Sequence, residues 1–339
     1  MTALMSFDIG GVTTEIEFSS KPACPEASVS VFDANTAGRF SAGAHGPVRL
    51  AAGEKAKQWE SVNAILRRCA QSGMGRDGTI AGFGGGVVCD LTAFAASLYM
   101  RGCRLVLVPT TLLAMADASL GGKTGIDFLG YKNLVGTFYP AHRIVIAPAA
   151  LESLPDREYR SGLAEVIKSA IIGDAALLDL LERDRERAMA RDADTVGEMI
   201  RRSLAVKGRI VQQDPRENGV RAVLNLGHTF GHALETATGF DGWTHGEAVA
   251  WGIGRALSAG LRFGMTDAAF ARRVRSLLRA YGYRLVAEAG FEALATAFGL
   301  DKKRAGGVTR LVIPCAAADV RVREAAPEDL AAALAEREP

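Results

Sequence analysis

Three of the five histidines of this chain fall within eighteen residues, at His228, His232 and His245. His228 and His232 are four residues apart, so on a helix they share one face. His245 follows Asp241 and Gly242, a turn signal that allows the chain to fold back toward that face. Because neutral imidazole is a common ligand of divalent metal ions, this crowding indicates a metal centre. The alternative interpretation is a set of ordinary polar histidines near a helix end.

A carboxylate that could complete such a centre precedes the histidines. Glu165 and Lys168 are three residues apart in an otherwise apolar helical segment, and a carboxylate that is buried there must be paired or bound to a metal. A surface salt bridge is the alternative. Glu165 with His228 and His245 would give a set of two histidines and one carboxylate, which leaves open positions as a catalytic zinc site does. His232 would then lie outside the ligand set or face the substrate.

Glycines and polar residues in the first half of the chain indicate a nucleotide site. Gly84-Gly85-Gly86 follows a predicted strand and opens a predicted helix, where backbone amides attract phosphate. Tight strand–helix turns need glycine in any case, so this motif alone is weak. Asp33 and Asn35 end an earlier strand, where a ribose hydroxyl is commonly bound, and Thr110-Thr111 ends a later one. These residues would gather at the carboxyl edge of a parallel sheet, which predicts a dinucleotide site.

Further polar residues suit an anionic substrate. Asp117, the Gly-rich segment 121–124 with its Lys123, and the pair Lys132-Asn133 lie close in sequence, and such groups bind phosphate and carboxylate oxygens. Surface lysines of a loop are the alternative. Arg221 and Asn225 precede the first clustered histidine by seven and three residues, so they can approach the same cavity.

Two kinds of pattern position these residues. The first 150 residues or so alternate short apolar runs with helical patterns, which is typical of a βαβ sheet, with strands expected at 28–32, 79–83, 104–108 and 143–147 and helices at 55–70 and 90–99. After Pro155 helical patterns dominate, at 162–181, 195–211, 228–238, 247–263 and 268–281, with a late strand pair at 309–313 and 319–322. We therefore expect an α/β, Rossmann-like nucleotide-binding domain over 1–152 and a mainly α-helical metal- and substrate-binding domain over 153–339.

Composition narrows the class of protein. A chain of 339 residues with 48% hydrophobic and 23% charged residues is expected to be folded and soluble. Its net charge of +2 and the lack of a basic run argue against nucleic acid or a membrane surface as a partner. Five scattered cysteines without a CxxC pair and an N-terminus unlike a signal peptide predict reduced thiols in the cytoplasm.

Several separated blocks resemble one enzyme family. They are GGGVVCDLTAFAASLYMRG (84–102), VPTTLLAMADASLGGKTG (108–125), KNLVGTFY (132–139), LPDREYRSGLAEVIK (154–168), RAVLNLGHTFGHALE (221–235) and HGEAVAWG (245–252). Between about Asp33 and Arg310 the chain resembles the 3-dehydroquinate synthase family of the sugar-phosphate cyclase superfamily. The resemblance implies a nucleotide-binding α/β domain, a helical domain and an active site in the cleft between them, with NAD, Zn²⁺ or Co²⁺, and a homodimer.

The resemblance also assigns residues by position. The metal ligands it implies are Glu165, His228 and His245. The NAD contacts it implies are Asp33, Asn35, Glu54, Lys57, Gly86, Val87, Val88, Asp90, Thr110, Thr111, Lys123, Lys132, Leu151 and Ser153. The catalytic and substrate-binding residues it implies are Arg101, Asp117, Lys123, Asn133, Lys168, Lys207, Arg221, Asn225, His232, Lys302 and Lys303. Arg101 is expected to reach the active site of the neighbouring subunit.

The activity that the resemblance implies is that of a carbon–oxygen lyase of the shikimate pathway, which leads to chorismate and the aromatic amino acids. It converts 3-deoxy-D-arabino-heptulosonate 7-phosphate to 3-dehydroquinate and phosphate through transient oxidation by NAD. The alternatives are a cyclase acting on sedoheptulose 7-phosphate or glucose 6-phosphate, a metal-dependent polyol dehydrogenase, and a silent NAD-binding protein. Cys89 stands where the family usually has glycine, a position at which a side chain could crowd the NAD pyrophosphate.

Overall fold

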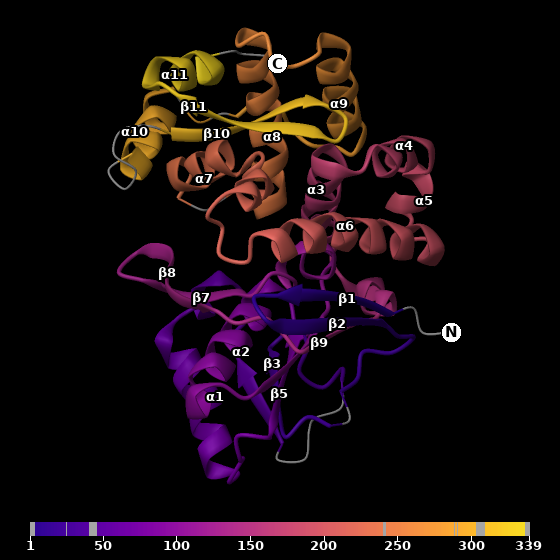
Figure 1. Cartoon of the computed structure of the whole chain (residues 1–339), viewed down its shortest axis with the longest axis vertical. Coiled ribbons are helices and arrows are strands. Elements are labelled where there is room, and N and C mark those ends of the chain that lie inside the picture. The colour runs from indigo at the N-terminus through magenta and orange to yellow at the C-terminus, as the bar shows by residue number, and fades with distance from the viewer. Residues whose placement is uncertain are drawn as a thin grey trace. The chain divides into compact units, whose positions relative to one another are not determined.

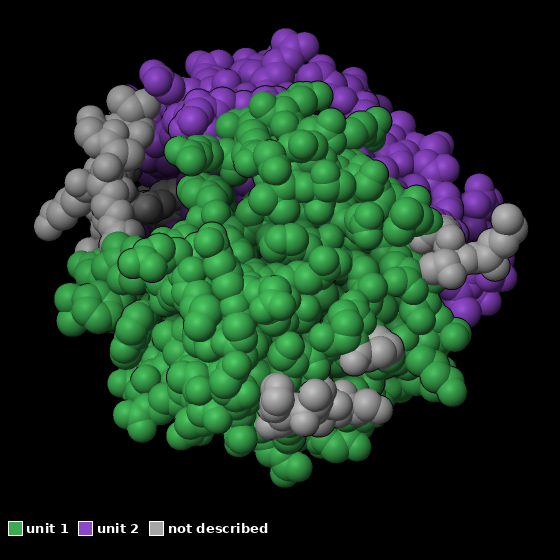
Figure 2. Space-filling model, turned by 60° about the horizontal axis from the view of Figure 1, so that its bottom comes forward, with its two compact units in different colours: residues 1–154, 207–216 green, residues 155–206, 217–339 purple. Residues whose placement is uncertain are grey.

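The computed structural model describes residues 4–24, 26–40, 46–239, 242–287, 289, 291–302 and 309–335. The chain divides into two compact units (Figure 2), of which unit 1 comprises Met1–Leu154 with Lys207–Arg216 and unit 2 comprises Pro155–Val206 with Glu217–Pro339. The unit boundaries cut helix α6 (Ala193–Gln213), whose last turns belong to unit 1. Among the described residues, no helix has both the length and the apolar composition needed to cross a bilayer.

Unit 1 contains the predicted parallel α/β sheet. Its strand order is β1-β2-β9-β6-β5-β3-β4, and all neighbouring pairs are parallel except β1 with β2. The bounds are β1 Leu4–Ile9, β2 Val12–Phe18, β3 Val29–Asp33, β4 Pro47–Leu50, β5 Thr79–Gly84, β6 Arg104–Pro109 and β9 Arg143–Ile146. Every residue of β5 is buried, as expected for a central parallel strand that is covered on both faces. The α/β prediction for this half of the chain is confirmed.

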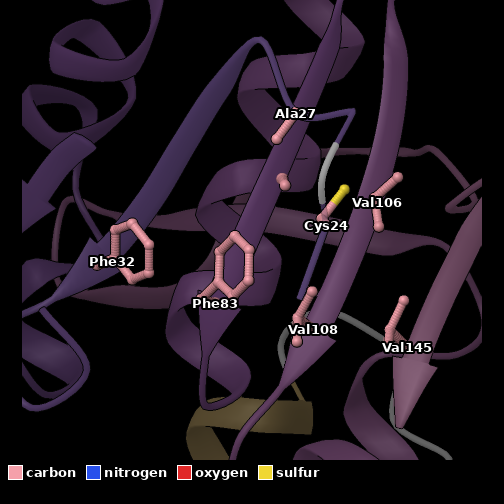
Figure 3. Packing of buried hydrophobic residues seen from close by; sticks show 8 residues of the cluster. Cys24, Ala27, Phe32, Phe83, Val106, Val108 and Val145 are labelled. Atoms are coloured by element: carbon pink, nitrogen blue, oxygen red, sulfur yellow. The ribbon is translucent and has the colours of Figure 1, made fainter. Parts of the chain in front are cut away.

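The core of unit 1 lies on the sheet. The rings of Phe32 and Phe83, on neighbouring strands, stack with centroids 4.8 Å apart, and Val106, Val108 and Val145 extend the same apolar cluster (Figure 3). Helices α1 (Trp59–Gln71) and α2 (Gly86–Leu98) pack against each other, and α2 packs against β5 and β6. These contacts fix the loops at the carboxyl ends of the strands, which carry the predicted nucleotide residues.

The sequence did not predict three features of unit 1. The hairpin of β1 with β2, the edge strand β4, and a separate hairpin of β7 (Lys123–Phe128) with β8 (Tyr131–Phe138) have no counterpart among the expected strands. The side chains of β8 are mostly exposed, so its sequence lacks the apolar alternation that marks a half-buried strand. The helix expected at 55–70 begins only at Trp59, after a 3₁₀ turn, Glu54–Ala56.

Unit 2 is mainly helical, with a two-stranded sheet of β10 (Thr309–Ala316) and β11 (Asp319–Ala325), which confirms the predicted class (Figure 1). Its helices are α3 Asp156–Gly173, α4 Ala175–Arg183, α5 Arg185–Met189, the first part of α6, α7 His228–Ala237, α8 His245–Arg262, α9 Ala268–Ala280, α10 Phe291–Lys302 and α11 Pro327–Ala335. The single helix expected at 162–181 is wrong. The chain breaks at Asp174, whose side chain accepts a hydrogen bond from the Leu177 amide and so caps a new helix.

Candidate functional site

Three helices of unit 2 bring together the predicted metal ligands. Glu165 lies in the middle of α3, His228 is the first residue of α7, and His245 is the first residue of α8. Oε1 of Glu165 lies 3.7 Å from Nε2 of His228 and 3.4 Å from Nε2 of His245. One ligand atom from each residue therefore lies within 4.8 Å of the others, close enough for a single cation to bind all three.

Glycines allow these helices to approach so closely. A Cβ on Gly246 would overlap the carbonyl oxygen of Ser161 in α3, and a Cβ on Gly252 would overlap the carbonyl oxygen of Gly227. Gly227 precedes α7 with a φ of 80°, a left-handed conformation that favours glycine. The small residues around the histidines thus set the spacing of α3, α7 and α8 that the site requires.

Hydrogen bonds fix the start of α8, and with it His245. Thr244 and Glu247 form a capping box, in which each side chain bonds the backbone amide of the other residue. Arg157 of α3 lies 3.3 Å from the Glu247 carboxylate, and the Gly246 amide donates to the Ser161 hydroxyl at 3.0 Å. Helix α3 therefore supplies one ligand and also anchors the helix that carries another.

The Glu165 carboxylate is buried, with 1% of its side chain exposed. Its Oε2 lies 2.5 Å from the ammonium of Lys168, which is 2% exposed. Apart from this ionic contact, neither Glu165 oxygen has a described partner with normal hydrogen-bond geometry. Burial raises the pKa of Glu165, but Lys168 and the two imidazoles outweigh it and hold that pKa well below its usual range. The carboxylate is therefore charged and available to a cation.

The two histidines have opposite pKa shifts. Burial and the nearby charge of Lys168 lower the pKa of His228 to about 3, so this ring is neutral at pH 7. Burial also lowers the pKa of His245, but Glu165 and Glu235 outweigh it and raise the value to about 9. A neutral imidazole, a second imidazole that can give up its proton, and a buried carboxylate form a donor set that suits zinc and similar cations.

A second carboxylate adjoins this set. Oε1 of Glu235 lies 3.4 Å from Nδ1 of His245, and one atom each from His232, Glu235 and His245 forms a second group within 4.8 Å. The ring of His232 is exposed and lies with its centroid 5.4 Å from that of His228. Sequence reasoning missed Glu235, although its position three residues after His232 on the same helix was a signal for it.

Arg221 and Asn225, two further predicted residues of unit 2, lie on one short segment that contacts α3. Arg221 is buried in a 3₁₀ helix, Val220–Asn225, and the Asn225 amide donates to Glu217 at 2.6 Å. Glu217 was not predicted. Lys302 is the last residue of α10, and nothing is described of its side chain. Lys303 lies outside the described residues.

In unit 1 the predicted nucleotide residues follow the strands as expected. Oδ1 of Asp33 accepts hydrogen bonds from the amides of Asn35 and Thr36, so it fixes the turn after β3. Gly86, Val87, Val88 and Asp90 form the first turns of α2, and Thr110 and Thr111 follow β6. Leu151 is buried and Ser153 exposed in the 3₁₀ segment Pro148–Ser153.

The Cys89 side chain lies inside the packing of α2. It is 1% exposed, its sulfur lies 3.9 Å from the carbonyl oxygen of Gly84, and burial raises the pKa of the thiol. A thiol buried in this way gives no support to the expectation that it crowds a bound pyrophosphate.

Lys57 connects several residues of unit 1 that were predicted separately. Its buried ammonium lies 2.6 Å from Oδ2 of Asp90 and 2.5 Å from Oδ1 of Asn133. Lys132 lies 4.0 Å from Glu54. The Lys57 ammonium thus joins the start of α2 to the hairpin of β7 with β8, and the Lys132 ammonium joins that hairpin to the 3₁₀ turn at Glu54.

The remaining predicted residues of unit 1 also have defined places. Lys207, in the part of α6 that belongs to unit 1, pairs with Asp117 at 2.5 Å. Lys123 is exposed at the start of β7. Arg101 is exposed, with a φ of 65°, and follows Met100, with a φ of 49°. Two consecutive non-glycine residues in this left-handed region are unusual and often mark a functional turn.

Two family models match the chain, 3-dehydroquinate synthase N-terminal over residues 47–161 and 3-dehydroquinate synthase C-terminal over residues 162–304. The 3-dehydroquinate synthase of Dictyoglomus thermophilum is 43% identical over 269 residues, which cover 79% of this chain and 76% of that protein. The structure is similar to 2-epi-5-epi-valiolone synthase from Streptomyces hygroscopicus with NAD⁺ and Zn²⁺ bound, with 27% identity, a TM-score of 0.85 and coverage of 95% and 97% of the two chains.

A second structure, of lower sequence identity, shares the fold. A 2-deoxy-scyllo-inosose synthase, complexed with carbaglucose-6-phosphate, NAD⁺ and Co²⁺, gives a TM-score of 0.88 at 20% identity, covering 99% of this chain and 100% of that one. The matched family models cover most of the chain, and the relative with 43% identity spans most of it as well. The chain belongs to the 3-dehydroquinate synthase family.

Proposed function

We propose that the protein converts 3-deoxy-D-arabino-heptulosonate 7-phosphate to 3-dehydroquinate and phosphate, as a carbon–oxygen lyase of the shikimate pathway. The observation that carries this proposal is the approach of Glu165, His228 and His245 to one another beside the buried ammonium of Lys168. Such a set suits a cation that polarises a hydroxyl oxygen of an anionic sugar. The identity to 3-dehydroquinate synthases, higher than to the valiolone synthase, supports this substrate over those of the sibling cyclases.

The cofactors follow from the donor sets and from the related structures. Glu165, His228 and His245 would hold Zn²⁺ or Co²⁺, the ions named for the two structural neighbours. The loops after β3, β5 and β6 would hold NAD, with Asp33 near the ribose and the first turn of α2 near the pyrophosphate. When bound, NAD and the cation supply a reversible oxidation of one carbinol, which makes the neighbouring hydrogen acidic.

The residues of this chain then hold and neutralise the substrate. We propose that Lys168 and Lys207 face its phosphate and hydroxyl oxygens, and that Arg221, Asn225 and His232 face its carboxylate and phosphate. Cationic groups stabilise the charge that develops as phosphate leaves. The leaving phosphate itself can accept the proton. After re-reduction of the ketone, the sugar ring would open and the new ring would form by an intramolecular aldol closure. By holding the opened intermediate in one conformation, these residues would favour that closure.

The assembly expected for the family is a homodimer, and we propose that it forms through unit 1. The hairpin of β7 with β8 exposes large apolar side chains: Phe128, Tyr131, Leu134 and Phe138 are each 45–52% exposed. The Thr137 hydroxyl donates to Ser97 at the end of α2, so the hairpin adjoins the turn that carries Arg101. This position suits the expected role of Arg101 in the active site of a second subunit.

An assay of phosphate release tests the proposal. Zinc-loaded enzyme with catalytic amounts of NAD is mixed in turn with the heptulosonate phosphate, sedoheptulose 7-phosphate and glucose 6-phosphate. We expect stoichiometric phosphate from the heptulosonate alone, without net NADH. Release from another sugar phosphate would make the protein a sibling cyclase, and net NADH from a polyol would make it a dehydrogenase. NAD binding without any turnover would support a silent homologue.

The division into domains at 152/153 and the cytoplasmic location stay predictions.

A further inference from the structure

We infer that Glu235 is a positioning residue of the metal centre, because its carboxylate holds the His245 ring with Nε2 turned toward the cation. This inference rests on the metal site of the proposed function and adds to it a residue outside the ligand set. Glu235 lies on α7, two residues before its end, and its side chain is 6% exposed.

The geometry places one carboxylate at each nitrogen of the His245 ring. Nδ1 lies 3.4 Å from Oε1 of Glu235, and Nε2 lies 3.4 Å from Oε1 of Glu165. Glu165 belongs to the ligand set, so Nε2 is the nitrogen that would bind the cation. If Nδ1 carries the hydrogen and donates it to Glu235, the tautomer is fixed and the Nε2 lone pair is free for coordination.

The other histidine of the set has the same arrangement. Nδ1 of His228 lies 3.2 Å from the carbonyl oxygen of Leu226, while its Nε2 faces Glu165. Both histidines thus present Nε2 to the centre and have an oxygen acceptor at Nδ1. The difference is that a backbone carbonyl orients one ring and a charged side chain orients the other. Partners of both kinds fix the ring and raise its basicity as a ligand.

His245 has particular need of such a partner. It is the first residue of α8, and 34% of its side chain is exposed, against 15% for His228. Packing alone therefore restricts its ring less. The hydrogen bonds described above fix the backbone of Thr244, Gly246 and Glu247. The His245 ring adjoins the rings of His228 and His232, but the polar groups that face its two nitrogens are Glu165 and Glu235. Losing Glu235 would remove the acceptor at Nδ1 and so weaken the control of the ring orientation.

The experiment uses the full-length protein and measures metal binding without substrate. Glu235→Gln removes the charge and keeps an acceptor, and Glu235→Ala removes both. Glu158→Gln, at an exposed position of α3, is the matched control. Zinc dissociation constants are measured by competition with a chromogenic chelator, and the visible spectrum of the Co²⁺ form reports the ligand geometry. Melting curves in excess chelator report the fold without metal.

We expect Glu235→Gln to weaken zinc binding by roughly 10-fold and Glu235→Ala by up to about 100-fold, with an altered Co²⁺ spectrum, while the control matches the parent. The rise in Tm that zinc induces should be smaller in Glu235→Gln than in the parent, and smallest in Glu235→Ala. Unchanged zinc affinity and an unchanged Co²⁺ spectrum in both variants would overturn the inference. So would a second zinc ion per chain that is lost in both variants, because Glu235 would then be a ligand of another ion.

These results are separable from the proposed function. A parent protein that binds zinc but releases no phosphate from the heptulosonate would contradict the function and leave the role of Glu235 to be decided by the affinities. If the parent shows the proposed turnover and both Glu235 variants bind zinc as tightly as the parent, only the inference is contradicted. If the variants also melt earlier in chelator, the Co²⁺ spectrum at saturating metal still decides between a positioning role and a purely structural one.

Discussion

Lys168 lies 2.5 Å from Glu165, three residues earlier on α3, and both side chains are almost completely buried. A buried carboxylate needs a positive partner. In this protein the lysine meets that need without metal, and a bound cation would share the role. The pair therefore connects the stability of unit 2 to the occupancy of the metal centre.

Replacing Lys168 tests whether the stability of unit 2 depends on metal binding. We expect Lys168→Met to lower the free energy of unfolding of the metal-free protein by about 3 kcal/mol, because it leaves Glu165 buried without its nearest cation. Zinc should recover part of the loss by supplying positive charge. Melting curves in chelator and in excess zinc check this. A loss of the same size in both conditions would show that the metal does not neutralise Glu165.

Removing one imidazole should abolish the centre. We expect His245→Ala to lose both stoichiometric zinc and turnover, because the remaining histidine and carboxylate give too few ligands for tight binding. Zinc content after desalting, together with phosphate release, checks this. His142→Gln, in unit 1 and outside the predicted site residues, should keep both. Full zinc content and activity in the alanine variant would refute the assignment of His245.

The close approach of α8 to α3 can be tested with one methyl group. We expect Gly246→Ala to lower the free energy of unfolding by about 2 kcal/mol and to weaken zinc binding, because the new Cβ would overlap the backbone of Ser161 and displace His245. Gly197→Ala is the control, since its Cβ would meet only the end of Arg201 at 3.5 Å within helix α6. That change should be neutral or stabilise by about 0.5 kcal/mol. Equal effects of the two changes would contradict this account.

The capping carboxylate of α8 should make stability depend on pH. Burial raises the pKa of Glu247, but the Thr244 amide and Arg157 outweigh it and bring the pKa below its ordinary value of 4.5. A lowered pKa contributes stability that is complete above 4.5 and is lost as the pH falls through the folded value. Glu247→Ala should therefore cost about 1 kcal/mol at pH 7, and the difference from the parent should shrink below pH 4.5.

Urea unfolding of the chelated parent and variant at a series of pH values from 7 to 3.5 measures this difference. Glu158→Ala serves as the control for removing an acid from a helix start. A difference that stays constant or grows toward low pH would show that Glu247 acts without its charge.

Sequence alone determined the local features of this protein. Histidines at 228 and 232 with a turn before 245, and an acid inside an apolar helix at 165, predicted a metal centre because ligand chemistry depends on residue type and helical spacing. Buried parallel strands such as β5 were also predictable, because a short, continuous apolar run bounded by glycines is typical of a strand covered on both faces.

Tertiary structure decided what depends on residues distant in sequence. The role of Glu235 became visible only when α7 and α8 were packed together, because a carboxylate beside one histidine in sequence can face another in space. The hydrogen bond between Lys57 and Asn133, which are 76 residues apart, was likewise visible only in the structure. So was the exposed hairpin of β7 with β8, because its strands pair through backbone hydrogen bonds and its side chains show no clear alternation of apolar and polar residues. Side-chain types set which chemistry is available, and close packing between distant segments decides which groups carry it out.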